Sequence, residues 1–175
     1  ELKPDTDNAY ILIHLNTKMP LSGIKYQAAL ENGLLMEHTI SKYNVYVSKD
    51  GSSWTLAKTG TFHLTEENNY TEIVYFDKEG TTGGNQLWTY NDISYVKIEA
   101  VGNKNGISGA EIDVIAPPGD NVDLSNNTIG KLKEPFVYEE GKDPIPAGSV
   151  VFKGNYRGNP AFNAMLLVDA DDENK

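Results

Sequence analysis

The sequence predicts an all-β chain, and three observations support this fold class. From Lys42 to Val47, apolar and polar residues alternate, which is the period of a strand with one buried face. The dipeptide Asp50-Gly51 then separates this run from a second strand-like run that begins at Trp54, a strong signal for a tight hairpin. No segment of the chain sustains a helical period. We therefore expect a β-hairpin at the centre of the fold.

Two further strands are expected before this hairpin. Residues 10–15 alternate, with two isoleucines and a leucine on one face, and residues 23–29 alternate in the same way. Between them, residues 19–22 contain a proline and a serine and are expected to form a turn. Each run is short enough to be a single strand of a sheet.

Residues 30–39 are expected to form a loop that contains an unusually apolar run, Leu34-Leu35-Met36. These side chains either tuck beneath the loop or form a small exposed contact patch. Tucking is the more common outcome for apolar loop residues, and it is the one that we expect.

Three more strands are expected after the hairpin, at residues 72–76, 94–101 and 107–115. Within the second of these runs, Lys97 and Glu99 alternate with apolar residues and are therefore expected to face outward. The chain thus contains enough alternating runs to build two facing sheets.

These runs resemble the discoidin domain, also called the coagulation factor V/VIII C-type domain, a group that includes family-32 carbohydrate-binding modules. The central run is similar to the family pattern I-x-x-Y-x-V-Y-V-S, followed by a D-G turn and a tryptophan, here Trp54. Residues 10–15 resemble the strand Y-I-x-I-D-L, with His14 in place of the aspartate. Residues 94–101 and 107–115 resemble the strands R-Y-V-R-L and S-A-A-E-I. The resemblance covers residues 8–115.

The resemblance implies a jelly-roll β-sandwich that has Trp54 in its core and binds ligands through loops at one end. The family pattern holds one more strand before residues 10–15, so we expect a fragment of a longer protein or a replacement strand from another segment. Residues 116–120 contain two prolines, a glycine and an aspartate, which is typical of a linker. We expect the sandwich to span residues 1–116. Residues 117–175 would add an incomplete β segment, either the start of a second β-domain or an extension packed on the first.

Composition excludes several classes of function. The chain has 15 Lys and Arg against 25 Asp and Glu, a net charge of −10, so it lacks the basic surface that nucleic acids require. An acidic surface also disfavours anionic membranes, and no apolar run is long enough for membrane insertion. Cysteine is absent, which excludes disulfides and thiolate chemistry. With its ten Tyr, this composition favours a secreted or cell-surface protein of a bacterium.

Catalysis within these 175 residues is not expected. His14, His38 and His63 lie on separate predicted elements, without the H-E-x-x-H spacing of a metalloprotease. The chain has no G-x-S-x-G nucleophile elbow, and its adjacent acidic pairs are typical of solvated surface. We therefore expect a binding or structural module.

A sugar site requires an aromatic ring for the C–H face of a pyranose and planar polar groups for its hydroxyls. The long predicted loop at residues 77–90 supplies both kinds, in Asn85, Gln86, Trp88 and Tyr90. Loops of this length are often functional. The alternative is that Trp88 folds back into the rim of the core.

The resemblance adds two groups of candidates. It points to the loop at residues 31–39, where Thr39 occupies the position at which galactose-binding relatives often carry an arginine, so that Glu37 or His38 would have to substitute. It also implies a structural calcium ion held by Glu111, with Asp5 and Asp7 as further ligands.

We therefore expect a non-catalytic carbohydrate-binding or adhesion module whose partner is a glycan or cell-surface polysaccharide. Two alternatives remain at this stage. One is a structural spacer or a protein–protein interaction domain of a surface adhesin. The other is an accessory segment of a glycosidase or peptidase whose active site lies elsewhere.

Overall fold

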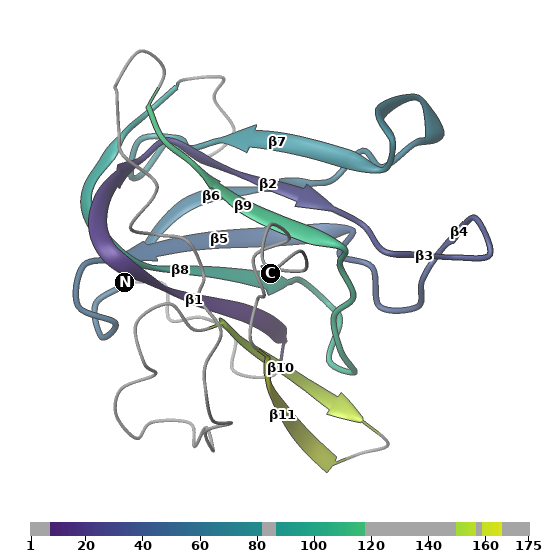
Figure 1. Cartoon of the computed structure of the whole chain (residues 1–175). Helices are drawn as coiled ribbons and strands as arrows, with labels where there is room; N and C mark the ends of the chain where they lie inside the picture. Colours follow the sequence, from purple (N-terminus) through teal and green to yellow (C-terminus); the bar gives the residue numbers. More distant parts are fainter. Residues whose placement is uncertain (1–7, 82–86, 118–149, 157–158, 166–175) are drawn as a thin grey trace, which may run out of the picture.

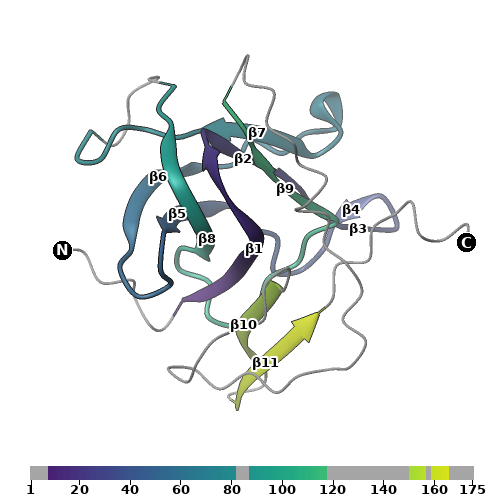
Figure 2. The same cartoon turned by 60° about the vertical axis from the view of Figure 1, so that its left-hand side comes forward.

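Two antiparallel β-sheets lie face to face in the computed structural model (Figures 1 and 2). The structure describes residues 8–81, 87–117, 150–156 and 159–165. The larger sheet has the strand order β11-β10-β1-β8-β5-β6. Its strands are β1 (Ala9–Leu21), β5 (Lys42–Ser48), β6 (Thr55–Thr61), β8 (Tyr90–Ala100), β10 (Val150–Tyr156) and β11 (Asn159–Met165).

The smaller sheet has the order β7-β2-β9. Its strands are β2 (Gly23–Gln27), β7 (Thr71–Tyr75) and β9 (Glu111–Ile115), and a separate small hairpin is formed by β3 (Leu30–Glu31) and β4 (Leu34–Leu35). A short 3-10 turn, η1 (Glu66–Asn68), is the one helical element in the described residues. No helix there has the length and apolarity to cross a bilayer. The prediction of an all-β sandwich is therefore confirmed.

The core lies between the two sheets and follows the predicted alternation. Most of its members are inward-facing side chains of β1, β5 and β8 on one side and of β2 and β7 on the other, and Ile40 and Phe76 join them from the adjoining segments. The largest fully buried ones are Tyr26, Phe76, Ile11, Leu21, Ile24, Ile40, Ile98, Val45, Val47 and Val96. Burial of this apolar surface is the main force that holds the sheets together.

Strand β1 is longer than predicted, and the turn expected at residues 19–22 is wrong. Met19 and Leu21 are buried and pair with Ile93 and Tyr90 of β8, so the chain stays in the larger sheet through Leu21. It passes directly to the smaller sheet at Ser22, whose backbone N–H donates to the carbonyl of Ile115. The burial of two apolar side chains outweighs the local turn preference of the proline and serine.

The predicted central hairpin is confirmed as β5 and β6, and the Asp-Gly dipeptide forms its turn. Gly51 has φ +77°, a left-handed conformation that glycine adopts without strain. A Cβ atom at this position would lie 3.1 Å from the ring of Tyr95, so the turn rests on that ring. The turn is thereby held against the outer face of the larger sheet.

Trp54 does not lie in the core between the sheets, so its predicted place is wrong. It packs on the outer face of the larger sheet, in a second small cluster with Tyr10, Leu12 and Tyr95. Its ring meets that of Tyr95 edge to face, with centroids 6.3 Å apart. The tight turn that precedes it carries the indole across the outside of the sheet rather than over its end.

Glu99 lies on the same outer face, as predicted, but it is buried rather than solvated. Only 1% of it is exposed, and its Oε2 accepts hydrogen bonds from Asn44 Nδ2 at 2.8 Å and from the Tyr46 hydroxyl at 3.4 Å. Alternation therefore gives the correct face of a strand, but not what covers that face.

The apolar loop residues do not tuck beneath their loop, so this expectation is also wrong. They form the β3–β4 hairpin, whose turn has φ +53° at Asn32 and +79° at Gly33. Leu34 is 73% exposed. The exposed apolar patch of this hairpin consists of Leu30, Leu34, Leu35 and Met36.

The β segment after residue 117 continues the larger sheet. Strand β10 pairs antiparallel with β1 along residues 150–153, and β11 pairs with β10. Figure 2 shows these two strands beside β1 at the edge of that sheet. Both strands lie within residues 117–175, where an additional β segment is expected from the sequence.

Candidate binding groove

The two predicted ligand-binding loops lie at opposite ends of the sandwich. In the antiparallel pair of β2 and β7, Gly23 faces Tyr75 and Gln27 faces Thr71. The segment that follows β2 therefore lies at one end of the sandwich, and the segment that follows β7 lies at the opposite end. Figure 1 shows the β3–β4 hairpin on the right and the tip of β7 on the left. The expectation that both loops contribute to one site does not hold.

A groove lies at the β7-tip end, between the turn of the central hairpin and the start of β8. Its volume is about 370 Å³. Val47 and Ile93 supply apolar surface, and the remaining lining is polar or aromatic. That lining consists of Ser48, Lys49, Asp50, Ser53, Thr55, Thr89, Tyr90 and Asn91. Among the predicted site residues that the structure describes, only Tyr90 lines it.

The hairpin turn presents a fixed carboxylate to this groove. Asp50 Oδ1 accepts hydrogen bonds from the backbone N–H groups of Ser52 and Ser53, each at 2.8 Å, and from the Ser48 hydroxyl at 3.1 Å. The two backbone N–H groups hold the pKa of Asp50 well below its usual range. Because Asp50 is also exposed, it offers an ionised acceptor at the mouth of the groove.

The opposite wall is shaped by a β-bulge in β8. Met19 faces Ile93 and Leu21 faces Tyr90, so that Pro20 alone stands opposite the two residues Asn91 and Asp92. Asp92 has φ +60°, a conformation that non-glycine residues rarely adopt. Bulges of this kind redirect side chains and are frequent beside functional sites. Here the bulge coincides with Asn91 in the groove lining.

Tyr90 is the aromatic residue of the groove lining, and its hydroxyl is already engaged. The hydroxyl donates to the backbone carbonyl of Asp77 at 2.7 Å, and the ring meets that of Phe76 edge to face. Burial first, and then the negative charges of Glu79 and Asp77, raise the pKa of Tyr90 to about 12. The side chain is therefore neutral, and its hydroxyl proton is already donated within the protein.

Trp88 lies two residues before Tyr90 and is 38% exposed. Its backbone N–H donates to the Phe76 carbonyl at 3.0 Å, and Lys78 Nζ lies 5.1 Å from the centre of its ring. The indole is therefore not enclosed between the sheets. It does not line the groove itself. Asn85 and Gln86, the two predicted amide residues of this loop, lie outside the described residues.

The loop that carries Trp88 is anchored by a buried ion pair that the sequence did not reveal. Asp77 is 1% exposed, and Lys58 Nζ lies 2.9 Å from its Oδ1. The Asp77 backbone N–H also donates to Ala57. Next to Tyr90, the hydroxyl of Thr89 is hydrogen-bonded to that of Ser22 at 2.7 Å. Both contacts fix the base of the loop to the sandwich.

Glu37 and His38 occupy the other end, close to the exposed apolar patch. Their side chains form a loose pair, with His38 Nε2 3.8 Å from Glu37 Oε1. Glu37 is almost fully exposed, and His38 has φ +69°. Thr39 follows, with its hydroxyl donating to the Met36 carbonyl at 2.7 Å. These residues do not approach the groove.

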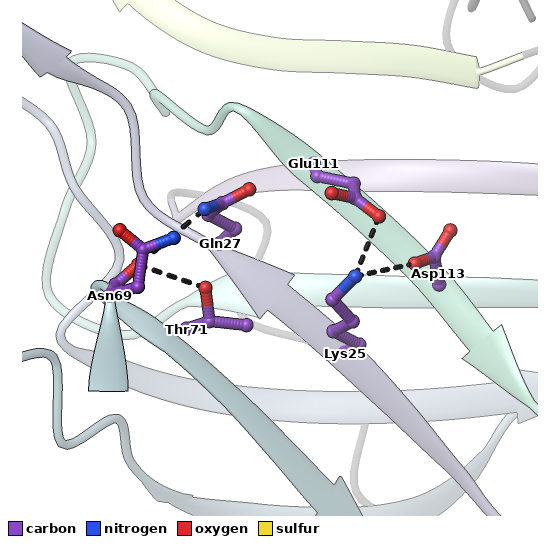
Figure 3. Close-up of polar contacts among 6 residues, drawn as sticks. All are labelled: Lys25, Gln27, Asn69, Thr71, Glu111 and Asp113. Carbon is purple, nitrogen blue, oxygen red and sulfur yellow. Dashed lines mark hydrogen bonds and ion pairs between the residues drawn. The ribbon is translucent and has the colours of Figure 1, made fainter. Parts of the chain in front are cut away.

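The expected calcium ligand Glu111 is already paired with a cation. Lys25 Nζ lies 2.7 Å from Glu111 and 3.2 Å from Asp113 on the outer face of the smaller sheet (Figure 3). The hydrogen bond from Lys25 lowers the pKa of Glu111, whereas burial and then the neighbouring Glu111 raise that of Asp113. A calcium ion at Glu111 would have to displace this ammonium group.

Asp5 and Asp7, the other two expected calcium ligands, lie outside the described residues. Within those residues, no three histidine or acidic side chains gather as a metal-ligand set. The outer face around Lys25 is instead a network of polar side chains and backbone. There, Gln27 Nε2 and the Thr71 hydroxyl both donate to the Asn69 carbonyl (Figure 3).

The three histidines lie in three different surroundings. The His14 ring stacks on that of Tyr95 with centroids 4.0 Å apart, and His63 Nδ1 lies 3.7 Å from Glu72. His38 belongs to the pair with Glu37. The three histidine side chains therefore belong to three separate places on the sandwich.

Comparison with known proteins agrees with this architecture. No curated protein matches the sequence. The F5/8 type C domain matches it over residues 2–112, which is more than half of the chain and includes both sheets up to β9. The family resemblance suggested by the central hairpin is thereby confirmed, and this chain belongs to the F5/8 type C, or discoidin, domain family.

Proposed function

We propose that this chain is a glycan-binding module of a secreted or bacterial cell-surface protein, and that it binds its ligand in the groove beside Tyr90. Domains of this family are typically non-catalytic binding modules that often bind carbohydrates or proteins. Fold membership alone does not fix the ligand. The proposal therefore depends on the groove.

The observation that carries the proposal is the combination of surfaces in the groove lining. Tyr90 is the aromatic residue of the lining, and Asp50, Asn91 and the hydroxyl groups are hydrogen-bonding partners around it. A pyranose presents the matching combination of C–H surface and hydroxyl groups. The half-exposed Trp88, two residues away along the chain, provides a second ring at the same end of the sandwich.

The fixed geometry of the groove supports binding with little reorganisation. The carboxylate of Asp50 is held by three hydrogen bonds, and the hydroxyl of Thr89 is hydrogen-bonded to that of Ser22. Side chains that are already ordered lose less conformational entropy when a ligand binds. A groove of about 370 Å³ has room for one or two sugar rings, so we expect weak single-site binding that repeated modules strengthen through avidity.

A glycan array, followed by calorimetry on the strongest hit, tests the proposal. Asn91→Ala and Trp88→Ala should each weaken binding at least about tenfold, the loss expected when one good contact disappears. Leu34→Ala, an exposed residue at the opposite end, serves as the control and should bind like wild type. The proposal fails if the intact chain binds no glycan, or if both groove-side variants bind as well as wild type.

One observation favours a second candidate function. The exposed apolar patch on the β3–β4 hairpin is the kind of surface that contacts other proteins. In that case the module would act through the end opposite to the groove. Concentration-dependent sedimentation of wild type and of Leu34→Ser would distinguish this function. If wild type binds no glycan but self-associates, and Leu34→Ser no longer self-associates, the result favours protein–protein contact as the function.

A further inference from the structure

We propose that Asp50 makes the groove selective for neutral and amino sugars and excludes uronic acids and other anionic glycans. This inference rests on the proposed function, because it names the chemical class of the ligand at the same groove.

Asp50 can only accept hydrogen bonds. Its carboxylate receives the backbone N–H groups of Ser52 and Ser53 at 2.8 Å each, and donation from backbone to the ionised form keeps it ionised. A sugar hydroxyl or a protonated amino group can donate to such a carboxylate. A sugar carboxylate cannot, and it would also place a second negative charge beside the first.

The one cation of the groove lining does not offset this charge. Among the described lining residues, only Lys49 and Asp50 are charged. Lys49 Nζ lies 3.4 Å from Asp92, which stands in the β8 bulge just outside the groove. The three charges therefore sum to −1. The chain as a whole carries −10, so its wider field also repels anionic ligands.

The turn fixes the carboxylate in place, so a ligand cannot push it aside at low cost. Asp50 Oδ1 also receives the Ser48 hydroxyl, while Ser48 Oγ receives the backbone N–H of Gly51 at 2.9 Å. Rotation of the Asp50 side chain would break several of these hydrogen bonds at once. A rigid carboxylate discriminates between ligands more strongly than a mobile one, because it cannot relax away from a like charge.

The test uses two matched ligand series on one array. One series presents oligosaccharides of glucose, glucosamine and glucuronic acid, and the other those of galactose, galactosamine and galacturonic acid. In the series that binds, the acid should bind at least about tenfold more weakly than the neutral sugar, and the amino sugar at least as well as it. The difference in affinity between the acid and the neutral sugar should become smaller when binding is titrated at higher salt, because salt screens surface charges.

Asp50→Asn is the informative variant, since an asparagine Oδ1 can still accept the two backbone N–H groups and preserve the turn. This variant should reduce the difference in affinity between the neutral sugar and the acid to less than about threefold. Glu67→Gln, which removes one charge at the other end of the sandwich, should leave the difference unchanged. If Asp50→Asn fails to fold, the salt titration of wild type decides the question.

The outcomes separate this inference from the proposed function. Binding of neither series overturns this inference, and the proposed function falls with it only if the wider glycan array also shows no binding. Binding of the acid as tightly as the neutral sugar overturns the role of Asp50 alone. A preference against acids that persists unchanged in Asp50→Asn, or at high salt, also overturns that role.

Discussion

Lys58 and Asp77 form an ion pair of 2.9 Å in which the aspartate is only 1% exposed, and this pair fastens the Trp88 loop to β6. Breaking an ion pair that involves a buried charge typically costs about 3–5 kcal/mol. We therefore expect Asp77→Ala to lower the free energy of unfolding by an amount in this range. Urea denaturation followed by tryptophan fluorescence measures it.

The matched control is the exposed pair of Lys49 and Asp92, which has a similar separation of 3.4 Å but side chains that are more than half exposed. Exposed ion pairs contribute about 0–1 kcal/mol. Asp92→Asn, which removes the charge but keeps a residue type that tolerates φ +60°, should therefore be nearly neutral for stability. Equal losses in Asp77→Ala and Asp92→Asn would contradict the assignment of Asp77 as a buried anchor.

The two tryptophans should respond differently to truncation. Trp54 packs on Tyr95 in the outer cluster and also lies under Lys97 Nζ, 5.7 Å from its ring centre. Trp54→Ala removes this packing, and we expect a loss of about 2–4 kcal/mol in unfolding free energy, since the site is only partly buried. Glycan binding by the folded fraction should be retained.

Trp88→Ala should show the opposite pattern, with a stability change below about 0.5 kcal/mol and a loss of binding. The physical reason is its exposure and its position outside both apolar clusters. Thermal melts and calorimetry on both variants check the pair of expectations. A large fall in melting temperature for Trp88→Ala would place this indole among the structural residues instead.

The strands and the family were accessible from sequence because they depend on local alternation. The β5–β6 hairpin, its Asp-Gly turn and the inward faces of β1 and β8 follow from neighbouring residues. The failures concern long-range contacts. Trp54 was placed in the wrong layer because its location depends on the outer face of β1 and β8, which no local pattern describes.

The groove could be predicted only in part for the same reason. Tyr90 was identified from its residue type, and Asp50 was recognised as a turn residue but not as a groove residue. Their approach depends on the pairing of β5 with β8. The bulge that coincides with Asn91 requires Pro20 to lie opposite β8, whereas local turn preference assigned that proline to a loop. Pairings between distant segments leave little trace in a single sequence.

Two glycines with nearly equal backbone angles allow the turn over Tyr95 to be tested. Gly51 and Gly33 have φ of +77° and +79°, but a Cβ atom would meet a ring at 3.1 Å only at Gly51. Gly33→Ala should cost about 1 kcal/mol from backbone strain alone. Gly51→Ala should cost about 1 kcal/mol more, because the turn must also lift from the ring. Chemical denaturation of both variants measures the difference, and equal losses would show that the turn does not rest on Tyr95.

The acid stability of the fold should depend on Asp50. Its pKa is lower in the folded chain than in the unfolded chain, where a value of about 3.9 applies. A depressed pKa contributes stability that is fully present above about pH 4 and is lost as the pH falls toward the folded value. The melting temperature of wild type should therefore fall between about pH 4 and pH 2, and that of Asp50→Asn should fall less over the same interval. Glu67→Gln provides the charge-matched comparison. Parallel pH profiles for wild type and Asp50→Asn would show that the hydrogen bonds from Ser52 and Ser53 do not stabilise the ionised carboxylate.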